Sequence, residues 1–474
     1  MSTGKKNIVI LGGGFGGTNA LLQLQKSLPV DTDVGITLIN NWNFFLYTPM
    51  LPEVATGGIE TRHVTQPLRG LCYKKSFNLV VAPIVSIDVG KKKVITTRKT
   101  FDYDYLLISL GSVNNFFGLP GVEERAFTLK NLEDSIRIRN HIVELFERAN
   151  LEDDGSKRKR MLSFVVAGAG PAGVELVTEM HDLIYYDLLS KFSTIKADDV
   201  KLYLLEAGTK ILPGMDEDLI AIALERINSM RIDLRLETPL ISADTTSVTL
   251  QNGEVFHCDT LIWTAGMKVM PIIEALNVPK HTDGRLKVNE FLEVQGYSGV
   301  FAIGDNAYFV SQKSGRALPP AAQFAMRQGK VAARNILHDI KGEQKEAFAF
   351  EPLGFLVSMG KRFSIANILG IRLHGFIAWL LWRIIYLSKL VGFERKIQVA
   401  MDWLLMEIFG RETVQEVRLF IDEGKCNGCS LCVKVCPTAT FQMKNGKSVV
   451  VNPRDCIECR TCIEECPVNC IEIK

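Results

Sequence analysis

The sequence predicts an α/β protein in which two copies of a strand, turn and helix unit are followed by helices and a small α+β domain. The segments 7–28 (NIVILGGGFGGTNALLQLQKSL) and 163–185 (SFVVAGAGPAGVELVTEMHDLIY) each run from an apolar strand through a glycine-rich turn into a helix. Near the C-terminus, two runs of four cysteines are offset by 30 residues, from Cys426 to Cys456. With 474 residues, the chain is long enough for several domains that each bury a core.

The overall charge is nearly balanced, with 55 Lys plus Arg against 53 Asp plus Glu. This balance gives no argument for a nucleic-acid partner. The N-terminus runs directly into a strand-like segment without a signal-peptide core, so we expect a cytoplasmic compartment. Nine of the eleven cysteines follow residue 425, and this clustering fits a reducing environment better than a secreted disulfide scaffold.

Both glycine turns follow an apolar strand and open a helix, so backbone N–H groups at the helix N-terminus can receive a pyrophosphate. One such motif is weak evidence. Two copies predict two Rossmann-like dinucleotide-binding domains, because glycines used only for tight turns do not easily explain both. The turn glycines are Gly12, Gly14 and Gly17 in the first segment and Gly168, Gly170 and Gly173 in the second.

The residue at the end of the next strand indicates which dinucleotide each turn binds. Glu206 ends the strand KLYLLE, and a carboxylate there accepts from a ribose 2′-OH and repels a 2′-phosphate. No arginine follows it in the stretch 207–210, so we expect NADH and not NADPH. In the first repeat, the strand ITLIN ends at the uncharged Asn40, which can still hydrogen-bond a hydroxyl.

Between and after the repeats, three segments complete the organisation of the chain. The charged stretch 152–160 (EDDGSKRKR) is interpreted as a solvated surface loop. Residues 286–345 return to a strand, an Asp-containing turn and a helix, and close the nucleotide-binding part. Between Lys361 and Lys396, seven Lys or Arg residues accompany a single acidic residue, Glu394, in an otherwise apolar segment.

The residues also resemble a known family. GGGFGG, FFLYTPMLPEVATGGIE, DYDYLLISLGS, GAGPAGVE, GVFAIGDNA and PPAAQFAMRQGKVAARNIL occur in the order found in type II NADH dehydrogenases. The C-terminal tract GIRLHGFIAWLLWRIIYLSKLVGFERKIQVAMDWLLMEIFGRE does so too. The resemblance covers about residues 5–413 and implies FAD in the first site, NADH in the second and a quinone as electron acceptor.

Roles for individual residues follow from this resemblance. It places Thr48 and Pro49 beside the flavin ring, Gly111 on the FAD side and Asp305 at the ribityl chain, where a carboxylate accepts from hydroxyls. It also places Glu175 near the point where nicotinamide meets flavin. The alternative for Glu175 is an ordinary helix carboxylate.

The quinone-side signature of the family, A-Q-x-A-x-Q, is only partly matched. Gln323 corresponds to the first glutamine, whereas Arg327 replaces the second. A cation at this position is expected to alter quinone choice or the proton path. Gln328 is a candidate replacement, although one position along a helix turns a side chain by about 100°.

The cysteines before residue 426 argue against a redox-active disulfide beside the flavin. Cys72 and Cys258 are isolated, without a C-x-x-x-x-C or C-x-x-C partner, and we expect each to be a small buried hydrophobe. Electrons must then leave the flavin for an external acceptor or for the C-terminal domain. We expect hydride transfer from nicotinamide to flavin, with the protein supplying orientation and electrostatics.

The apolar run 376–387 is too short, and with Arg383 too charged, for a spanning helix of about 20 residues. Further on, apolar residues recur at helical spacing beside Trp403, as Ile397, Met401, Leu404, Leu405 and Ile408. Such helices can lie in a membrane interface with Lys and Arg at anionic lipid headgroups. We expect a monotopic protein on the cytoplasmic face of the membrane; soluble core packing or a homodimer interface is the alternative.

The two cysteine runs have the C-x2-C-x2-C-x3-C-P spacing of bacterial two-cluster ferredoxins, in which the fourth cysteine of each run ligates the other [4Fe–4S] cluster. Zinc would usually have its cysteine pairs separated by a longer spacer. Cys470 is interpreted as a packing residue. The expected ligands are Cys426, Cys429, Cys432 and Cys466 for one cluster, and Cys456, Cys459, Cys462 and Cys436 for the other.

These observations predict a FAD-binding domain at 1–125 and 285–345, an NADH-binding domain at 126–284, a membrane-associated helical region at 346–413 and a ferredoxin domain at 414–474. We expect NADH oxidation with a membrane quinone as acceptor and the two clusters as an additional electron entry or exit, serving an external one-electron carrier protein. A soluble NADH:ferredoxin-type reductase with the clusters as obligatory acceptor is the alternative. A non-enzymatic redox-sensing or assembly subunit is a third interpretation.

Overall fold

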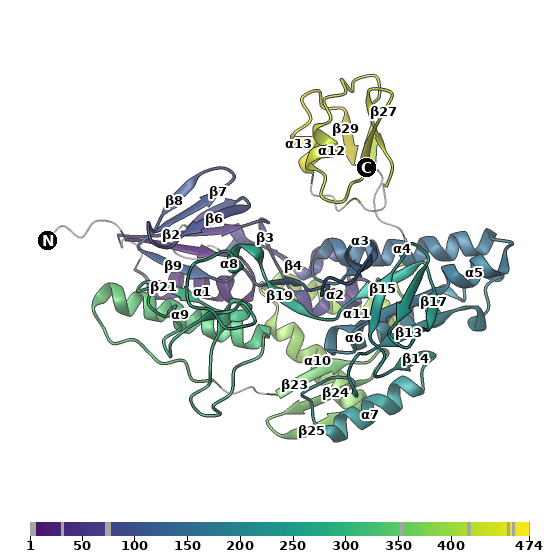
Figure 1. Ribbon diagram of the computed structural model, residues 1–474, viewed down its shortest axis with the longest axis horizontal. Coiled ribbons are helices and arrows are strands. Elements are labelled where there is room, and N and C mark those ends of the chain that lie inside the picture. The colour runs from purple at the N-terminus through teal and green to yellow at the C-terminus, as the bar shows by residue number, and fades with distance from the viewer. Residues whose placement is uncertain are drawn as a thin grey trace. The chain divides into compact units, whose positions relative to one another are not determined.

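The computed structural model describes residues 6–29, 33–71, 77–350, 354–414, 419–452, 456 and 460–473 (Figure 1). The chain forms two compact units. The first unit comprises Met1–Leu46, Thr65–Asn115 and Gly266–Phe355, and the second comprises Tyr47–Val64, Phe116–Ala265 and Leu356–Lys474. Each unit contains one of the two glycine turns.

The first unit is built on a parallel five-stranded sheet in the order β21-β9-β1-β2-β5. Helices α1 (Phe15–Ser27) and α9 (Ala322–Lys341) lie side by side, and a Cβ on Gly329 would come within 2.3 Å of Gly16 O. The sheet strands are β1 (Lys6–Leu11), β2 (Val34–Asn40), β5 (Asn78–Val81), β9 (Tyr105–Ile108) and β21 (Val300–Ala302). Smaller antiparallel pieces are β3 (Phe44–Leu46) with β4 (Thr65–Pro67), β6 (Ile84–Asp88) with β7 (Lys93–Thr96) and β8 (Thr100–Asp102), and β10 (Ser112–Asn114) with β19 (Met267–Val269).

The second unit repeats this design with a parallel sheet in the order β11-β18-β12-β13-β14. Its strands are β11 (Phe127–Thr128), β12 (Ser163–Ala167), β13 (Lys201–Leu205), β14 (Ile232–Arg235) and β18 (Thr260–Trp263), with an antiparallel sheet of β15 (Leu240–Ala243), β16 (Ser247–Leu250) and β17 (Val255–His257). Its helices are α4 (Leu132–Leu151), α6 (Pro171–Asp182) and α7 (Glu217–Asn228). The α6 helix continues as a π-helical turn, Leu183–Leu188, a form that is frequent at functional sites.

The charged stretch 152–160 corrects one prediction. Residues Gly155–Met161 form the helix α5 instead of a loop. The Asp154 carboxylate caps this helix by accepting from the backbone N–H of Ser156 and Lys157, and Arg160 pairs with Asp259 at 2.6 Å. The charged residues therefore form a helix and not a loop. The Asp154 carboxylate stabilises it by accepting from backbone N–H groups that are otherwise free at the helix N-terminus.

After the nucleotide-binding sheets, the chain forms an antiparallel sheet and two helices within the second unit. The strands are β23 (Gly354–Ser358), β24 (Ser364–Ile368) and β25 (Ile371–His374), and the helices are α10 (Gly375–Lys389) and α11 (Phe393–Phe409). No helix in the described part of the chain is both long enough and apolar enough to span a bilayer. The two helices predicted at 376–387 and 397–408 are thus present as α10 and α11.

The C-terminal residues form the predicted small α+β domain. Strand β26 (Leu419–Ile421) pairs with β29 (Ile471–Ile473), and β27 (Phe441–Lys444) pairs with β28 (Lys447–Val450), both antiparallel. Two short helices, α12 (Leu431–Val435) and α13 (Thr461–Glu464), lie within the two cysteine runs at equivalent places.

Candidate functional site

The first glycine turn lies between β1 and α1. Gly12 has a φ of +94°, and a Cβ there would lie 2.2 Å from Ser109 O, so only glycine fits. A Cβ on Gly17 would lie 1.9 Å from Gly12 O, so the helix begins directly against the end of the strand. A Cβ on Gly14, the N-cap of α1, would meet no described atom within 4 Å. The helix N-terminus therefore leaves room for a phosphate beside its free N–H groups.

The second turn, between β12 and α6, is built in the same way. Gly168 has a φ of +106°, and a Cβ there would lie 2.7 Å from Ala265 N. A Cβ on Gly173 would lie 1.9 Å from Gly168 O, whereas one on Gly170 would meet nothing within 4 Å among the described atoms. Pro171 opens the helix at its first position, where a missing N–H costs nothing. The two turns thus fit two dinucleotides, one in each unit.

The strand-end residues differ between the two turns. Asn40 accepts from Gly13 N at 2.9 Å through Oδ1 and donates to Trp42 O at 2.8 Å through Nδ2. Glu206 accepts from Ala169 N at 2.8 Å, and its other oxygen accepts from the backbone N–H two residues further on. Both side chains brace their glycine turn, but only Glu206 brings a charge to it.

The segment AIGD places further predicted residues of the first unit together. The Asp305 carboxylate accepts from Ser112 Oγ at 2.5 Å. Asn306 is fully buried, and its side chain accepts from Gly111 N and donates to Gly111 O. Gly111 has a φ of +73°. The sequence analysis missed Asn306, although it follows Asp305 directly in GDN. It brings Gly111 and Asp305 into one small cluster.

Helix α9 carries the residues of the incomplete quinone signature. Gln323 is half-buried, with Nε2 at 3.5 Å from Gly354 O. The Arg327 guanidinium stacks on the Phe350 ring at 3.9 Å from its centroid, and burial lowers the pKa of this arginine. The buried Gln328 accepts from Gly304 N at 2.7 Å. Gln328 therefore supports the AIGD segment instead of standing in for the missing glutamine.

Thr48 and Pro49 belong to the second unit, in a 3₁₀ turn (Thr48–Met50) that leads into the short helix α2 (Leu51–Val54). Both residues are half-buried. The same segment packs tightly against the residues that follow α11: a Cβ on Gly57 would lie 2.1 Å from Glu412 O. This close approach fixes the position of α2 within the unit.

Glu175 lies on α6, five residues after Gly170, the N-cap of this helix. Its side chain is 8% exposed, and Oε1 accepts from Ser358 N at 3.1 Å. The pKa of Glu175 is raised to about 8, mainly by burial; Glu53 and Glu179 contribute to the rise, whereas the Ser358 hydrogen bond opposes it. A carboxyl with this pKa can hold or release a proton near neutral pH.

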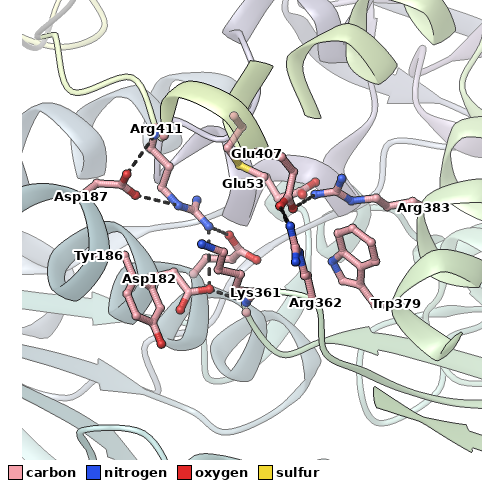
Figure 2. A pocket seen from close by; sticks show the side chains of 14 residues that line it. Glu53, Asp182, Tyr186, Asp187, Lys361, Arg362, Trp379, Arg383, Glu407 and Arg411 are labelled. Atoms are coloured by element: carbon pink, nitrogen blue, oxygen red, sulfur yellow. Dashed lines mark hydrogen bonds and ion pairs between the residues drawn. The ribbon is translucent and has the colours of Figure 1, made fainter. Parts of the chain in front are cut away.

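Glu175 is one member of a buried acidic cluster. Glu179 and Asp182 follow it at helical spacing on the same face of α6, and Glu53 reaches the cluster from α2. Arg411 supplies the compensating charge: its guanidinium lies 2.5 Å from Glu179 Oε2 and 4.0 Å from Asp182 Oδ2 (Figure 2). The sequence analysis identified only Glu175; the spacing 175, 179, 182 was the available signal for the others.

The helices α10 and α11 expose apolar side chains. All five residues of the predicted stripe on α11 are exposed, whereas Trp403 is buried. On α10 the exposed apolar residues are Phe376, Ile377, Leu380 and Ile384. Both helices therefore leave apolar surface uncovered within the described residues.

In the small C-terminal domain, most of the predicted ligand cysteines share one buried cluster. Cys470 lies between the two runs, with its Sγ 3.5 Å from Cys466 Sγ and its thiol also beside Cys426. Cys426 and Cys466 are thus brought together from opposite runs. Among the described residues, no three His, Cys, Asp or Glu side chains converge as a metal site. Cys459 and Cys72 lie outside the described residues. The buried cysteines of the cluster are Cys426, Cys432, Cys456, Cys462, Cys466 and Cys470, with Cys436 partly buried against them and Cys429 exposed.

Three family models match different parts of the chain. Residues 6–329 match the pyridine nucleotide-disulphide oxidoreductases, residues 353–412 the NDH2 C-terminal domain and residues 418–467 the 4Fe-4S dicluster domain. Cys258, buried in the core of the second unit, has the packing role expected of it.

Individual relatives agree with these matches. A probable NADH dehydrogenase of Dictyostelium discoideum is 36% identical over 417 residues, covering 86% of this chain and 90% of the relative. A type II NADH:quinone oxidoreductase of Mycobacterium tuberculosis is 29% identical, covering 84% and 87%. The NDH2 of Plasmodium falciparum, solved in complex with NADH, has the same fold, with a TM-score of 0.80 at 21% identity over 86% of this chain and 100% of that one.

Proposed function

The chain belongs to the type II NADH dehydrogenase family, and from this premise we propose that it oxidises NADH and passes the electrons through FAD to a membrane quinone. Bound FAD would supply the hydride acceptor, taking two electrons from nicotinamide and returning them to the second substrate. The proposal rests on two glycine turns with the same geometry, of which only the second is followed by a carboxylate, Glu206.

In the first unit, we propose that the FAD pyrophosphate binds at the N-terminus of α1, against Gly12, Gly14 and Gly17. Asn40 holds this turn in shape and keeps it uncharged. Asp305, steadied by Ser112, is suited to accept from the ribityl hydroxyls, with Gly111 beside it. Thr48 and Pro49, in the second unit, are assigned to the flavin ring.

In the second unit, the NADH pyrophosphate would bind at the N-terminus of α6, against Gly168, Gly170 and Gly173. Glu206 would accept from the adenosine ribose and exclude a 2′-phosphate. Glu175 is the proposed proton donor and acceptor near the flavin, since its raised pKa allows it to be protonated at neutral pH.

The quinone would meet Gln323, whose amide can donate to a carbonyl oxygen. Arg327 has no amide to replace the second glutamine of the family signature, and its guanidinium is stacked on Phe350. We infer that this cation and ring form one side of the quinone site and bias the choice of quinone.

The test is anaerobic stopped-flow mixing of the full-length holoenzyme with NADH, followed by a short-chain quinone. The expected result is bleaching of the flavin absorbance by NADH and its recovery on addition of quinone. Failure of every quinone tried to restore the absorbance would remove the quinone from the proposal and leave NADH oxidation as its supported part.

For the C-terminal domain, we propose two [4Fe–4S] clusters that act as an additional electron entry or exit for an external one-electron carrier. Cys426 and Cys466 come from opposite runs and both lie beside Cys470, which supports ligation across the two runs. Replacing Cys429 by Ser should then lower the iron content and leave flavin reoxidation by quinone unchanged. A matching loss of quinone reduction would instead favour the clusters as an obligatory acceptor route.

We further propose that α10 and α11 seat the enzyme on the cytoplasmic face of the membrane. The exposed apolar residues of both helices and the basic residues around them support an interfacial position on anionic lipid. Ile408→Glu should weaken binding to vesicles containing anionic lipid, whereas Leu151→Glu, at an exposed apolar position on α4, should not. Equal binding by both variants would contradict the proposal.

A further inference from the structure

A pocket in the second unit adjoins the buried acidic cluster. It has a volume of about 60 Å³, which is room for a few water molecules. Its walls come from α2, α6, the π-helical turn, the β23–β24 connection, α10 and the end of α11 (Figure 2). Tyr186, Lys361 and Arg362 line it and are exposed, so the pocket is reached from the surface of the unit.

Three arginines in the pocket wall are each paired with a carboxylate, whereas the Lys361 ammonium lies over the Tyr186 ring. Arg411 bonds Glu179 and also contacts Asp187 at 3.6 Å. Arg362 lies 2.8 Å and Arg383 lies 3.6 Å from the Glu407 carboxylate. Among the wall residues that the structure describes, Glu53 is therefore the carboxylate that has no salt bridge.

Glu53 is also incompletely hydrogen-bonded. Its Oε1 accepts from Trp403 Nε1 at 3.1 Å, whereas its Oε2 is buried and has no partner among the described residues. The side chain is 6% exposed. A buried ionised oxygen without a partner is costly, so the arrangement favours the protonated form of Glu53.

On its other side, Glu53 faces Glu175. The charge of Glu53 raises the pKa of Glu175, while the pKa of Glu53 is itself raised by burial first and by Glu179 second. The groups facing Glu53 are Glu175 and Glu179 from α6, Arg383 and Tyr386 from α10, Trp403 from α11 and Arg411 after it. Glu53 therefore lines the pocket and also acts on the carboxyl assigned to the flavin side.

We propose that Glu53 is a proton-transfer residue that carries protons from water in this pocket to Glu175 during quinone reduction. The inference rests on the proposed function, because it needs a quinone as acceptor. Reduction of a quinone to a quinol takes two electrons and two protons; NADH supplies both electrons and one proton as hydride, and the other proton comes from solvent. Glu175 gives a proton to a quinone oxygen, Glu53 reprotonates Glu175, and pocket water reprotonates Glu53.

The substitution Glu53→Gln separates this role from a structural one. Glutamine has the same shape, and its amide oxygen can still accept from Trp403, but the side chain carries no transferable proton. Glu60→Gln, on the same segment, is the matched control, because Glu60 is exposed and lies outside the pocket wall. The experiment uses the full-length holoenzyme and follows both half-reactions by flavin absorbance.

In E53Q, flavin reduction by NADH should match that of the wild type, and reoxidation by a short-chain quinone should slow by about a hundredfold, the lower range for general acid catalysis. The slowed step should show a larger solvent deuterium isotope effect. E60Q should reoxidise like the wild type. Reoxidation at the wild-type rate in E53Q overturns the proposal, whereas a wild type that no quinone reoxidises overturns the proposed function.

Trp403→Phe provides a second measurement if E53Q loses FAD. It removes the hydrogen bond that stabilises the Glu53 carboxylate, so the pKa of Glu53 should rise further. The pH profile of quinone-driven reoxidation should then shift to higher pH. A lower rate with an unshifted profile would mean that Trp403 and Glu53 act only through packing, and would overturn the proposal.

Discussion

The two glycine turns have nearly the same backbone, but the helices that follow them are used differently. After the first turn, α1 buries uncharged residues, and Gly329 lets α9 approach it closely. After the second turn, α6 buries three carboxylates, at 175, 179 and 182, against Arg411. The turn geometry determines where a dinucleotide can bind, whereas the buried face of the following helix determines which chemistry lies next to it.

The strand-end residues show the same division. Asn40 both donates and accepts, so it completes hydrogen bonds within its own loop. Glu206 only accepts, and it keeps a charge next to its turn. Only the second turn therefore presents a carboxylate that can accept from a ribose 2′-OH and repel a 2′-phosphate.

The largest effects are expected where the turns leave no space. Gly12→Ala would place a methyl group 2.2 Å from Ser109 O at a φ of +94°, and should lower the free energy of unfolding by more than about 2 kcal/mol and abolish FAD binding. Gly14→Ala meets no described atom within 4 Å and should fold normally. Thermal unfolding of the purified proteins tests both; an equal loss of stability in the two variants would contradict this assignment of the turn.

Gly168→Ala should break the second turn and leave the first intact. The added methyl group would lie 2.7 Å from Ala265 N at a φ of +106°. The purified variant should therefore retain its FAD absorbance, yet NADH should fail to bleach it. Loss of FAD in this variant, with the protein still folded, would mean that the two turns are not assigned to separate dinucleotides.

Glu206→Gln should have a smaller effect, because the backbone of the turn stays as it is. Loss of a charge-assisted hydrogen bond to a ribose costs about 1.5–3 kcal/mol, which is about a tenfold or larger rise in KM for NADH. The rate with NADPH relative to NADH should increase. Asn40→Asp is the matched change in the first turn and should leave both KM values unchanged, since it touches only the FAD side.

The fold was largely predictable from these local patterns. A strand, a glycine turn and a helix with an apolar face need only nearby residues, and β1 with α1 and β12 with α6 appear where the patterns place them. The stretch 152–160 was wrongly interpreted as a loop, because its helix depends on the Asp154 cap and on a pairing with Asp259, about a hundred residues away in the chain.

The candidate site was less predictable, for a similar reason. Glu53 lies in the apolar run LPEVA and has no local pattern that marks it as functional. Its environment comes from Trp403 and Arg411, which are far away in the sequence. Gln328 shows the converse: its sequence position suggests a replacement for the missing glutamine, whereas its hydrogen bond to Gly304 N assigns it to the support of a turn.

The smallest effect follows from the contrast between the neutral face of α1 and the acidic face of α6. Burial raises the pKa of Glu175 from 4.5 to about 8, so between these values the folded protein holds a proton that the unfolded chain has released. The free energy of unfolding therefore falls as pH rises through this window, by on the order of 1 kcal/mol per pH unit for one such group. Glu175→Gln should flatten this decline, whereas Glu225→Gln, at an exposed position on α7, should not. Urea unfolding at a series of pH values from 5 to 8.5 measures the slope of the free energy of unfolding against pH. An unchanged slope in the Glu175 variant would mean that this carboxyl is ionised in the folded protein, and that the helix after the second turn does not store a proton.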